Sequence, residues 1–578
     1  MRLHRTLSLL AAYAAISTNA AATDIVPRDM SPEAIKARRD AFCERLGGSN
    51  SRDYSLFEER EANASFLAEE TAKQGSPVIG PAIAEVLKAF GSKQVDHCLQ
   101  AVLSINPNAR KDAEMLDQER ERGTLRGPLH GFPILVKDNI ETRELPTTAG
   151  SYALLANDTG RDAPAVARLR AGGAVILGKT NLSEWANFRS TDSTSGWSAL
   201  GGQTRNPHAL DRTPCGSSSG SAVAVAAGYV AVALGTETNG SIICPSAMNG
   251  IVGFKPTVGL VSRTHVVPIS PTQDTIGPMA RSVADAALIL SVMAGTDADD
   301  PATAEADARR PSAELPADAL GGMTIGVLRF AEGDDPRVSA LFEEALALIE
   351  AQGATLVEIA AWDAPDSLGA DEFTVLLAEF EASLNAYLAS TPDSVEVRTL
   401  ADLIAFNSAN AKEELPLFGQ DILEQAQATD GLDDEAYQAA LPRLLAAVRV
   451  DGIDKFLADT GADMLVAPTA GPAFLIDPVS GDSYDGGIGA GYIAAIAGTP
   501  HLTVPMGTVQ GLPVGVSFFG AAWDDETVLA AGADYEAAST KIVRPTFRRD
   551  AFAAPETKDA LTRDRDPMDG ARREVSRD

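Results

Sequence analysis

The chain has 578 residues, of which 45 % are hydrophobic, so it is long enough to bury a large core. It carries 80 acidic against 48 basic residues, a formal net charge of −32, and such a surface repels nucleic-acid phosphates, so we expect no nucleic-acid partner. Four cysteines in a chain of this length exclude a disulfide-stapled scaffold, and none lies in a C-x-x-C pair or has zinc spacing with histidine.

The N-terminus has the three parts of a secretory signal peptide. Met1–Arg5 is basic, Thr6–Ile16 is a short apolar stretch, and Ala20–Ala22 is a small-residue cleavage site. The sequence thus predicts a signal peptide over residues 1–22, a mature start near Thr23, and a secreted or periplasmic protein. The alternative is a buried or disordered N-terminal helix. No stretch of the sequence reaches the roughly 18 uninterrupted apolar residues of a membrane helix, so we expect no stable membrane span.

Strand and helix patterns alternate along the chain. Helices are predicted over residues 31–46, 81–90, 109–122, 164–171, 223–227 and 336–352, and strands over residues 99–105, 131–137, 174–178, 230–234, 324–328, 464–467, 502–504 and 515–519. Residues from about 370 to 460 read as acidic amphipathic helices, which we expect to form a peripheral layer bordering the site. The alternation predicts a single α/β catalytic domain over residues 23–550, with a central mixed β-sheet covered by helices. The charged stretch 551–578 is expected to be a disordered tail.

The strongest local signal is a pair of Gly/Ser-rich turns, Cys215–Ser221 and Gly235–Ser241. A serine nucleophile needs a base, and acyl transfer needs backbone donors for the oxyanion. Glycine permits the tight backbone that aims successive N–H groups at one point. Taken singly, each turn is more typical of a solvated loop. Together they make a candidate acyl-transfer site.

Gly216–Gly220 also fits the G-x-S-x-G nucleophile elbow, which would make Ser218 the nucleophile of an α/β-hydrolase. That elbow follows directly on an apolar strand and needs a late histidine. The preceding stretch Asn206–Pro214 is polar and contains two prolines, and only His265 and His501 lie downstream. The elbow is therefore the disfavoured alternative.

Lys137 ends the apolar run Gly131–Val136. Full burial lowers the pKa of a lysine from ~10.4 by up to 3–5 units, so a buried neutral lysine can act as a general base. Considered alone, Lys137 is better explained as a strand-end residue that reaches solvent or pairs with Asp138.

Taken together, these features resemble the amidase signature family. The segment Gly202–Thr257 is similar to the family's Gly/Ser-rich signature throughout, and further similarity covers Gly178–Trp185, Gln273–Pro278, Gly498–Pro500 and Gly511–Gly515. The resemblance implies the amidase signature fold and an amidohydrolase that cleaves carboxamide C–N bonds through an acyl-enzyme. It implies no metal and no organic cofactor.

Carried over residue by residue, the resemblance makes Ser241 the nucleophile, Ser217 the bridging serine and Lys137 the base. The peptide bond of the bridging serine is cis in the family. The implied oxyanion donors are the backbone N–H groups of Thr238, Asn239, Gly240 and Ser241. Asn239 stands where many members have glycine, which leaves backbone donation intact.

The four cysteines fall into two pairs. Cys215 and Cys244 flank the two serines, and we interpret them as small packing residues, with a redox or nucleophilic role as the alternative. Cys43 and Cys98 lie outside the signature near the mature N-terminus, and we expect them to form a disulfide. The alternative for Cys43 and Cys98 is two buried free thiols.

The run from Trp185 to Ser219 is especially similar to bacterial peptide amidases, which release ammonia from C-terminal peptide amides. Some small-acid amidases of the family carry an arginine, where this chain has Cys244, that grips a substrate carboxylate. We therefore expect an uncharged acyl group, with Ser218, Ile242 and Cys244 contacting substrate.

Other substrates remain open. They are small aliphatic, aromatic or fatty amides, the last with a membrane-associated enzyme, or aminoacyl-tRNA for a transamidosome-type subunit. Binding of tRNA needs positive surface, which the acidic composition disfavours. A non-catalytic binding protein would be expected to have lost a member of the triad. Nothing in the sequence sets an oligomeric state.

Overall fold

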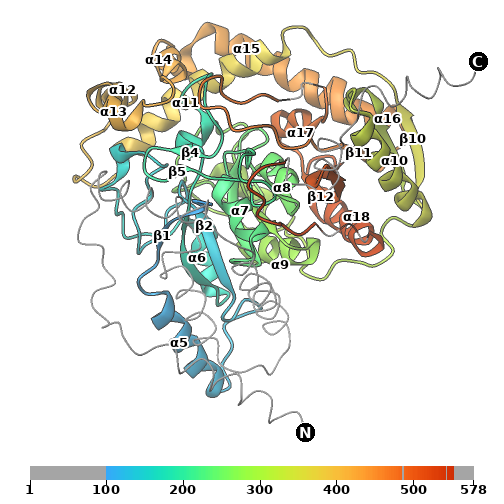
Figure 1. Cartoon of the computed structure of the whole chain (residues 1–578), viewed down its shortest axis with the longest axis horizontal. Helices are drawn as coiled ribbons and strands as arrows, with labels where there is room; N and C mark the ends of the chain where they lie inside the picture. Colours follow the sequence, from blue (N-terminus) through green and yellow to red (C-terminus); the bar gives the residue numbers. More distant parts are fainter. Residues whose placement is uncertain (1–98, 485–486, 540, 542, 552–578) are drawn as a thin grey trace, which may run out of the picture.

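The computed structural model describes residues 99–484, 487–539, 541 and 543–551 (Figure 1). The predicted signal peptide, the predicted Cys43–Cys98 disulfide, the two predicted helices before residue 91 and the tail after residue 551 lie outside the described residues. Among the described helices, none combines the length and the apolar character needed to cross a membrane.

A mixed sheet of eleven strands forms the centre of the described chain, as the alternating patterns predict. Its order is β1-β3-β2-β6-β8-β7-β12-β13-β11-β9-β10. The strands are β1 (Val102–Ile105), β2 (Pro133–Lys137), β3 (Val175–Thr180), β6 (Val232–Glu237), β7 (Val252–Lys255), β8 (Thr275–Ala280), β9 (Thr324–Leu328), β10 (Thr355–Ile359), β11 (Met464–Pro468), β12 (His501–Val509) and β13 (Leu512–Phe519). A separate ribbon pairs β4 (Trp197–Ser198) with β5 (Gly202–Gln203).

Strand β2 lies between β3 and β6 and runs parallel to both. The carboxyl ends of β2 and β6 therefore lie side by side, which is where α/β sheets commonly place ligand sites. The side chains of β2 alternate between the two faces, because Ile134 and Val136 belong to one hydrophobic cluster and Leu135 to another.

Helices cover both faces of this sheet (Figure 1). The cluster of Ile134 and Val136 takes in α6 (Pro164–Ala171), α9 (Val283–Met293), α10 (Pro336–Ala351) and α18 (Asp525–Ala538). The cluster of Leu135 takes in α5 (Ala109–Glu121) and α7 (Ser219–Ala226), and α8 (Ile243–Asn249) packs against α7. On the β11 side, α17 (Gly491–Ala497) packs in a further cluster with Leu465 and Phe519.

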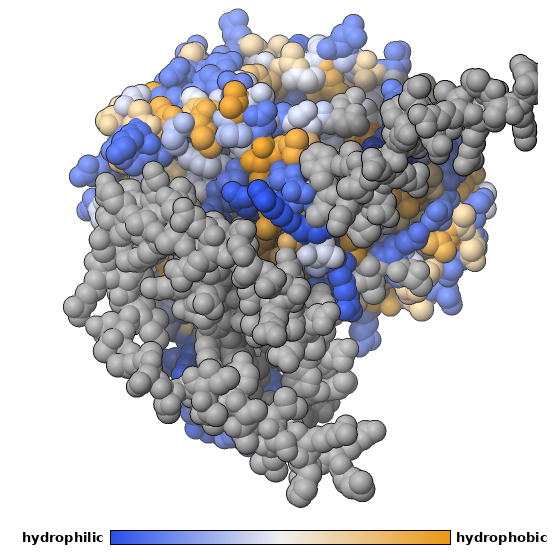
Figure 2. Space-filling view, in the orientation of Figure 1, coloured by the Kyte–Doolittle hydropathy of each residue, from blue (hydrophilic) through white to orange (hydrophobic). Residues whose placement is uncertain are grey.

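Residues 368–460 form an outer helical layer, in agreement with the amphipathic pattern. It comprises α11 (Leu368–Ala389), α12 (Leu400–Ala409), α13 (Ala411–Glu414), α14 (Asp421–Gln427), α15 (Glu435–Leu445), the π-helical segment Ala446–Ile453 and α16 (Asp454–Thr460). Phe380 of α11 meets Phe188 edge-on with ring centroids 5.1 Å apart, which fixes the layer to the chain that follows β3. Hydrophilic residues cover much of the layer on the face that Figure 2 shows.

Several details of the sheet differ from the sequence prediction, and β10, for example, was not predicted. Strand β6 was expected to turn at Gly235 but continues to Glu237, because it pairs with β8 along its whole length. Strands β7 and β8 were not predicted as strands, and both contain glycine, which weakens the strand pattern. At Gly277 the glycine is required, since a Cβ there would lie 2.0 Å from the Phe254 carbonyl oxygen.

Candidate active site

Lys137 ends β2 and is wholly buried. Its Nζ lies 2.7 Å from Ser217 Oγ, 2.8 Å from Thr236 Oγ1 and 3.2 Å from the Thr236 carbonyl oxygen. Burial lowers the pKa of Lys137 to about 7, although the charges of Asp274 and Glu237 raise it. The structure therefore places against a serine hydroxyl a lysine whose pKa is lowered far enough for the neutral amine to be populated near pH 7.

The alternative partner of Lys137, the neighbouring carboxylate of Asp138, is engaged elsewhere. Asp138 forms a buried ion pair with Lys179 of β3, with 2.9 Å between Nζ and Oδ1. The interpretation of Lys137 as a strand-end residue that reaches solvent or pairs with Asp138 is wrong, because its side chain is wholly buried and Asp138 pairs with Lys179.

Ser217 lies in the loop of residues 213–219, called the Ser217 loop below. Its peptide bond to Gly216 is cis, as the resemblance implies. The Ser217 carbonyl accepts a hydrogen bond from the Ser183 N–H at 3.0 Å. A Cβ at position 216 would lie 2.2 Å from Ser183 Oγ, so only glycine fits between the loop and Ser183. These contacts hold the Ser217 side chain towards Lys137.

Ser218 is wholly buried and makes structural contacts. Its hydroxyl donates to the Thr236 carbonyl at 3.1 Å and accepts from the Thr236 N–H at 3.2 Å. Its own N–H donates to the Ser241 carbonyl at 3.1 Å. This geometry supports neither the nucleophile elbow nor the expected contact of the Ser218 side chain with substrate.

Ser241 lies between β6 and α8, in residues 238–244, called the Ser241 loop below. It is 8 % exposed, and its hydroxyl has no hydrogen-bond partner within the described chain. The N–H groups of Thr238, Asn239, Gly240 and Ser241 likewise find no acceptor among the described residues. Gly240 has a φ of +81°, and a Cβ there would meet nothing within 4 Å. The predicted oxyanion donors therefore remain available to a ligand.

Side chains that the sequence analysis did not assign to the site form hydrogen bonds at both ends of the Ser241 loop. At its start, Thr238 Oγ1 donates to Asp274 Oδ1 at 2.5 Å. At its end, Glu237 Oε2 accepts the N–H groups of Ile242 and Ile243 at 2.7 and 3.0 Å. Because one carboxylate binds both N–H groups, the chain from 237 to 243 closes into a fixed loop.

The outer helical layer also reaches the Ser241 loop. Asn239 Nδ2 donates to Glu372 Oε1 of α11 at 2.7 Å. Gln273 Nε2 donates to the same oxygen at 3.0 Å and to the Thr238 carbonyl at 3.2 Å. Burial raises the pKa of the Glu372 carboxyl, and the hydrogen bonds from Gln273 and Asn239 oppose this. The Asn239 side chain, which stands where many members of the resembled family have glycine, is therefore held by a hydrogen bond to α11.

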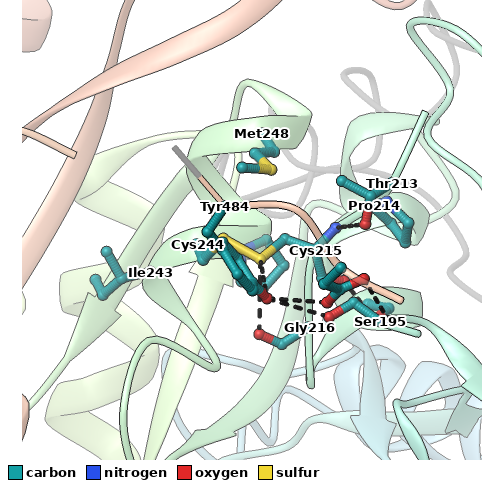
Figure 3. Close-up of a disulfide and its surroundings, with 12 residues drawn as sticks. Ser195, Thr213, Pro214, Cys215, Gly216, Ile243, Cys244, Met248 and Tyr484 are labelled. Atoms are coloured by element: carbon teal, nitrogen blue, oxygen red, sulfur yellow. Dashed lines mark hydrogen bonds between the residues drawn. A yellow bond between two sulfur atoms is a disulfide. The ribbon is translucent and has the colours of Figure 1, made fainter. Parts of the chain in front are cut away.

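The other two side chains expected to contact substrate are placed differently from the prediction. Ile242 is wholly buried in the cluster that includes Leu135, so its side chain packs in the core. Cys244 forms a disulfide with Cys215, with Cα atoms 5.9 Å apart (Figure 3). The interpretation of Cys215 and Cys244 as small packing residues is wrong, because the fold brings the Ser217 loop against the first turn of α8.

A cavity of about 260 Å³, counted with the space that opens to solvent, adjoins the start of the Ser241 loop. Its lining residues are Asn139, Ala186, Thr236, Thr238, Arg263, Val266, Val267, Ile269, Asp274, Thr275 and Ile276. It lies on the β8 side of the loop, and Ser218, Ile242 and Cys244 do not line it.

Comparison with known sequences identifies the family. The Amidase family profile matches residues 85–529. A probable amidase of Arabidopsis thaliana is 39 % identical over 459 residues, which cover 78 % of this chain and 85 % of the relative. A glutamyl-tRNA(Gln) amidotransferase subunit from Roseiflexus castenholzii is 36 % identical over 457 residues, which cover 77 % of this chain and 90 % of the relative.

Solved structures show the same fold. The native peptide amidase of Stenotrophomonas maltophilia is 46 % identical with a TM-score of 0.75, over 84 % of this chain and 98 % of that one. An amidase family protein of Bacillus anthracis is 31 % identical with a TM-score of 0.75, over 90 % of this chain and 99 % of that one. The chain therefore belongs to the amidase signature family and is an amide-cleaving hydrolase.

Proposed function

We propose that this protein hydrolyses the C-terminal carboxamide of amidated peptides, with Ser241 as nucleophile, Ser217 as proton relay and Lys137 as base. One observation carries the triad: the wholly buried Lys137 lies 2.7 Å from Ser217, on a loop that touches that of Ser241. No cofactor takes part in this mechanism.

The partners of Lys137 suit a neutral amine. Its two N–H groups donate to Thr236 Oγ1 and to the Thr236 carbonyl, at 2.8 and 3.2 Å. Ser217 Oγ lies 2.7 Å from Nζ, where the lone pair of the neutral amine would accept the Ser217 proton. A protonated Lys137 has no lone pair and cannot start the relay.

The reaction follows from this arrangement. Ser241 Oγ attacks the amide carbonyl as its proton passes to Ser217 and the Ser217 proton passes to Lys137. The N–H groups of residues 238–241 bind the oxyanion, and loss of one such donor typically costs ~10²–10³ in rate. The proton then returns along the relay to the leaving nitrogen, which departs as ammonia. Water attacks the acyl-enzyme by the same relay and frees Ser241.

Two observations support a peptide amide as the substrate. The chain is 46 % identical to a peptide amidase over 84 % of its length. Where some small-acid amidases carry an arginine, it has the half-cystine Cys244, which packs with Met248, Ala473 and Phe474. An apolar cluster beside the nucleophile favours an uncharged acyl group.

A second candidate function comes from the relatives. Similarity to the glutamyl-tRNA(Gln) amidotransferase subunit, at 36 % identity, favours a transfer reaction in which glutamine donates its amide nitrogen and aminoacyl-tRNA accepts it. The formal charge of −32 disfavours tRNA binding. We retain it, with small aliphatic, aromatic and fatty amides, as an alternative that the substrate experiment decides.

We also propose that the protein is secreted or periplasmic. The signal-peptide pattern of residues 1–22 supports export. The Cys215–Cys244 disulfide supports an oxidising compartment, because disulfides are rare in the cytosol.

Ammonia release across a panel of amides tests the substrate proposal. We expect a blocked dipeptide amide to react at least about tenfold faster, by kcat/KM, than malonamate, a gap of about 1.4 kcal/mol. Free glutamine, fatty amides and small aliphatic amides complete the panel, and mass spectrometry checks that internal peptide bonds survive. Equal kcat/KM values for the dipeptide amide and malonamate would reject the peptide-amide proposal, but the assignment as an amidase would stand.

Substitutions test the triad. We expect Ser241→Ala to abolish turnover in a folded protein, and Lys137→Ala and Ser217→Ala each to lower kcat by roughly 10³-fold or more, without additivity. The matched control is Ser218→Ala, which changes the adjacent serine and should cost far less. An inactive Ser218→Ala with an active Ser241→Ala would restore the elbow mechanism.

A further inference from the structure

One disulfide joins the two loops that carry the serines (Figure 3). Cys215 lies two positions before Ser217, and Cys244 lies three positions after Ser241. Because consecutive Cα atoms are about 3.8 Å apart, each serine is within roughly 8–11 Å of chain from the cross-link. The other covalent path between the serines runs through the whole of α7 and β6. The disulfide is therefore the shorter of the two covalent connections between Ser217 and Ser241, and it restrains the distance between them more than the path through α7 and β6 does.

The backbone at Cys215 needs restraint. Its φ is +54°, in the left-handed region that residues with a Cβ rarely adopt. Thr213 Oγ1 accepts the Cys215 N–H at 3.0 Å, and Ser219 Oγ donates to the Cys215 carbonyl at 2.6 Å. The disulfide adds a covalent restraint to these two hydrogen bonds. Reduction would leave the residue before Gly216 and Ser217 free to relax from this conformation.

Hydrogen bonds between the two loops remain when the disulfide is open. The Ser218 N–H donates to the Ser241 carbonyl at 3.1 Å. Asn249, at the far end of α8, donates from Nδ2 to the Pro214 carbonyl at 2.8 Å. These contacts hold the fold together but leave the Ser217 and Ser241 side chains less tightly placed. Reduction is therefore expected to change geometry without unfolding the domain.

The two half-cystines differ in exposure. Cys215 is wholly buried and Cys244 is half-buried. The Tyr484 hydroxyl lies 3.7 Å from Cys215 Sγ, and the Tyr484 ring meets Phe474 edge-on at 5.1 Å, as Figure 3 shows in part. A reductant therefore attacks most readily at Cys244 Sγ.

We infer that the Cys215–Cys244 disulfide is a positioning element of the triad, and that amide hydrolysis depends on the oxidised state of this pair. The inference rests on the proposed function. Proton transfer from Ser241 to Ser217 needs hydrogen-bond distance, and a displacement of about 1 Å costs on the order of 10²-fold in rate. Opening the cross-link permits displacements of that size.

A dithiol reagent reduces the pair in two exchanges. A reagent thiolate attacks Cys244 Sγ, the sulfur–sulfur bond breaks, and Cys215 leaves as a thiolate that takes up a proton. The second reagent thiolate attacks the mixed disulfide and releases Cys244, which is protonated in turn. Two electrons and two protons pass from the dithiol to the protein, and the reagent becomes a cyclic disulfide.

The test compares oxidised wild type, wild type reduced with dithiothreitol, and the double variant C215A/C244A. Two quantities are measured: kcat and KM on a blocked dipeptide amide, and the rate at which phenylmethylsulfonyl fluoride sulfonylates Ser241. We expect both the reduced enzyme and the double variant to lose at least about tenfold in kcat and in sulfonylation rate, with KM within about twofold. Circular dichroism at the assay temperature checks that both remain folded. If the double variant is unfolded, the kcat and sulfonylation rate of reduced wild type, measured at a low temperature where it stays folded, decide the test.

Matched controls separate this pair from the other cysteines. C43A/C98A should keep the full response to dithiothreitol, and C215A/C244A should show no further response. The inference is overturned if kcat and sulfonylation stay within about twofold of the oxidised enzyme, or if only KM rises. An oxidised wild type that hydrolyses no amide would reject the proposed function, while the sulfonylation rates would still decide the role of the disulfide.

Discussion

Lys137 is surrounded by groups that act on its charge in opposite directions. Burial disfavours the ammonium form, and the carboxylates of Asp274 and Glu237 favour it, which leaves the pKa of Lys137 at about 7. Without those carboxylates the lysine would be neutral over a wider pH range. Asp274 thus connects the charge of the base to the start of the Ser241 loop, because its Oδ1 accepts from Thr238 Oγ1 at 2.5 Å. Its Oδ2 accepts the N–H groups of Ile269 and Ser270 at 2.8 and 2.9 Å.

The pH dependence of kcat/KM tests this balance. The base acts only when neutral, so we expect activity to rise with pH through an inflection near the Lys137 pKa of about 7. A negative neighbour stabilises the protonated form and raises a lysine pKa, so Asp274→Asn should lower it and move the inflection to lower pH. The control Asp459→Asn, which breaks a surface pair with Lys455, should not move it. A shift to higher pH would contradict the assignment.

At this scale the sequence identified the residues with a chemical signature. Lys137, Ser217 and Ser241 stand in recognisable runs, and the structure brings the first two into contact. Asp274 and Glu372 have no such signature, since any surface carboxylate looks the same until the fold places it. The pairing of Cys215 with Cys244 was missed for a related reason, because their approach depends on how α8 packs on the Ser217 loop.

Among the elements, α11 is the one that connects the outer helical layer to the Ser241 loop. Glu372 Oε1 accepts hydrogen bonds from the side chains of Asn239 and Gln273. Asn239 belongs to the Ser241 loop, and Gln273 also donates to the Thr238 carbonyl, so this one oxygen restrains the loop in two ways. Since the N–H groups of this loop must converge on the oxyanion, a loosened loop binds it less well. The helix therefore positions the donors without touching the reacting atoms.

Double-mutant analysis tests the role of α11. We expect Glu372→Ala and Asn239→Ala each to lower kcat by about tenfold and the double variant to cost little more than either, because both remove the same hydrogen bond. The control is Glu381→Ala on the same helix, whose carboxylate accepts only from Asn385 among the described side chains. Additive losses, or an equal loss in Glu381→Ala, would show that α11 acts through stability alone.

The elements that the sequence predicted best are β2, β9 and β11, whose residues are mostly apolar and whose observed bounds lie within two residues of the predicted ones. The site elements β7 and β8 were harder, because they contain glycines and gain their strand conformation from pairing. The length of β6 was underestimated for the same reason. Its last two residues, Thr236 and Glu237, then place the partners of Lys137 and of the Ser241 loop.

At the scale of the whole molecule, the net charge of −32 creates a field that acts on substrates still in solution. Such a field changes kcat/KM, because it alters how often a charged substrate meets the site, and it leaves kcat largely unchanged. Salt screens it, since the Debye length falls from about 10 Å at 0.1 M to about 3 Å at 1 M. Cys244 stands where some small-acid amidases carry an arginine, and Arg263, which lines the cavity, is paired with Asp300.

We therefore expect a cationic dipeptide amide to be hydrolysed about tenfold faster, by kcat/KM at low salt, than an anionic one of similar size, and the ratio to approach one at about 1 M salt. The comparison uses blocked dipeptide amides that differ only in lysine or glutamate before a common amidated residue. The matching glutamine peptide is the neutral control and should respond little to salt. A ratio that does not change with salt would place the preference in contacts within the pocket, and a preference for the anionic peptide would contradict an effect of the acidic surface.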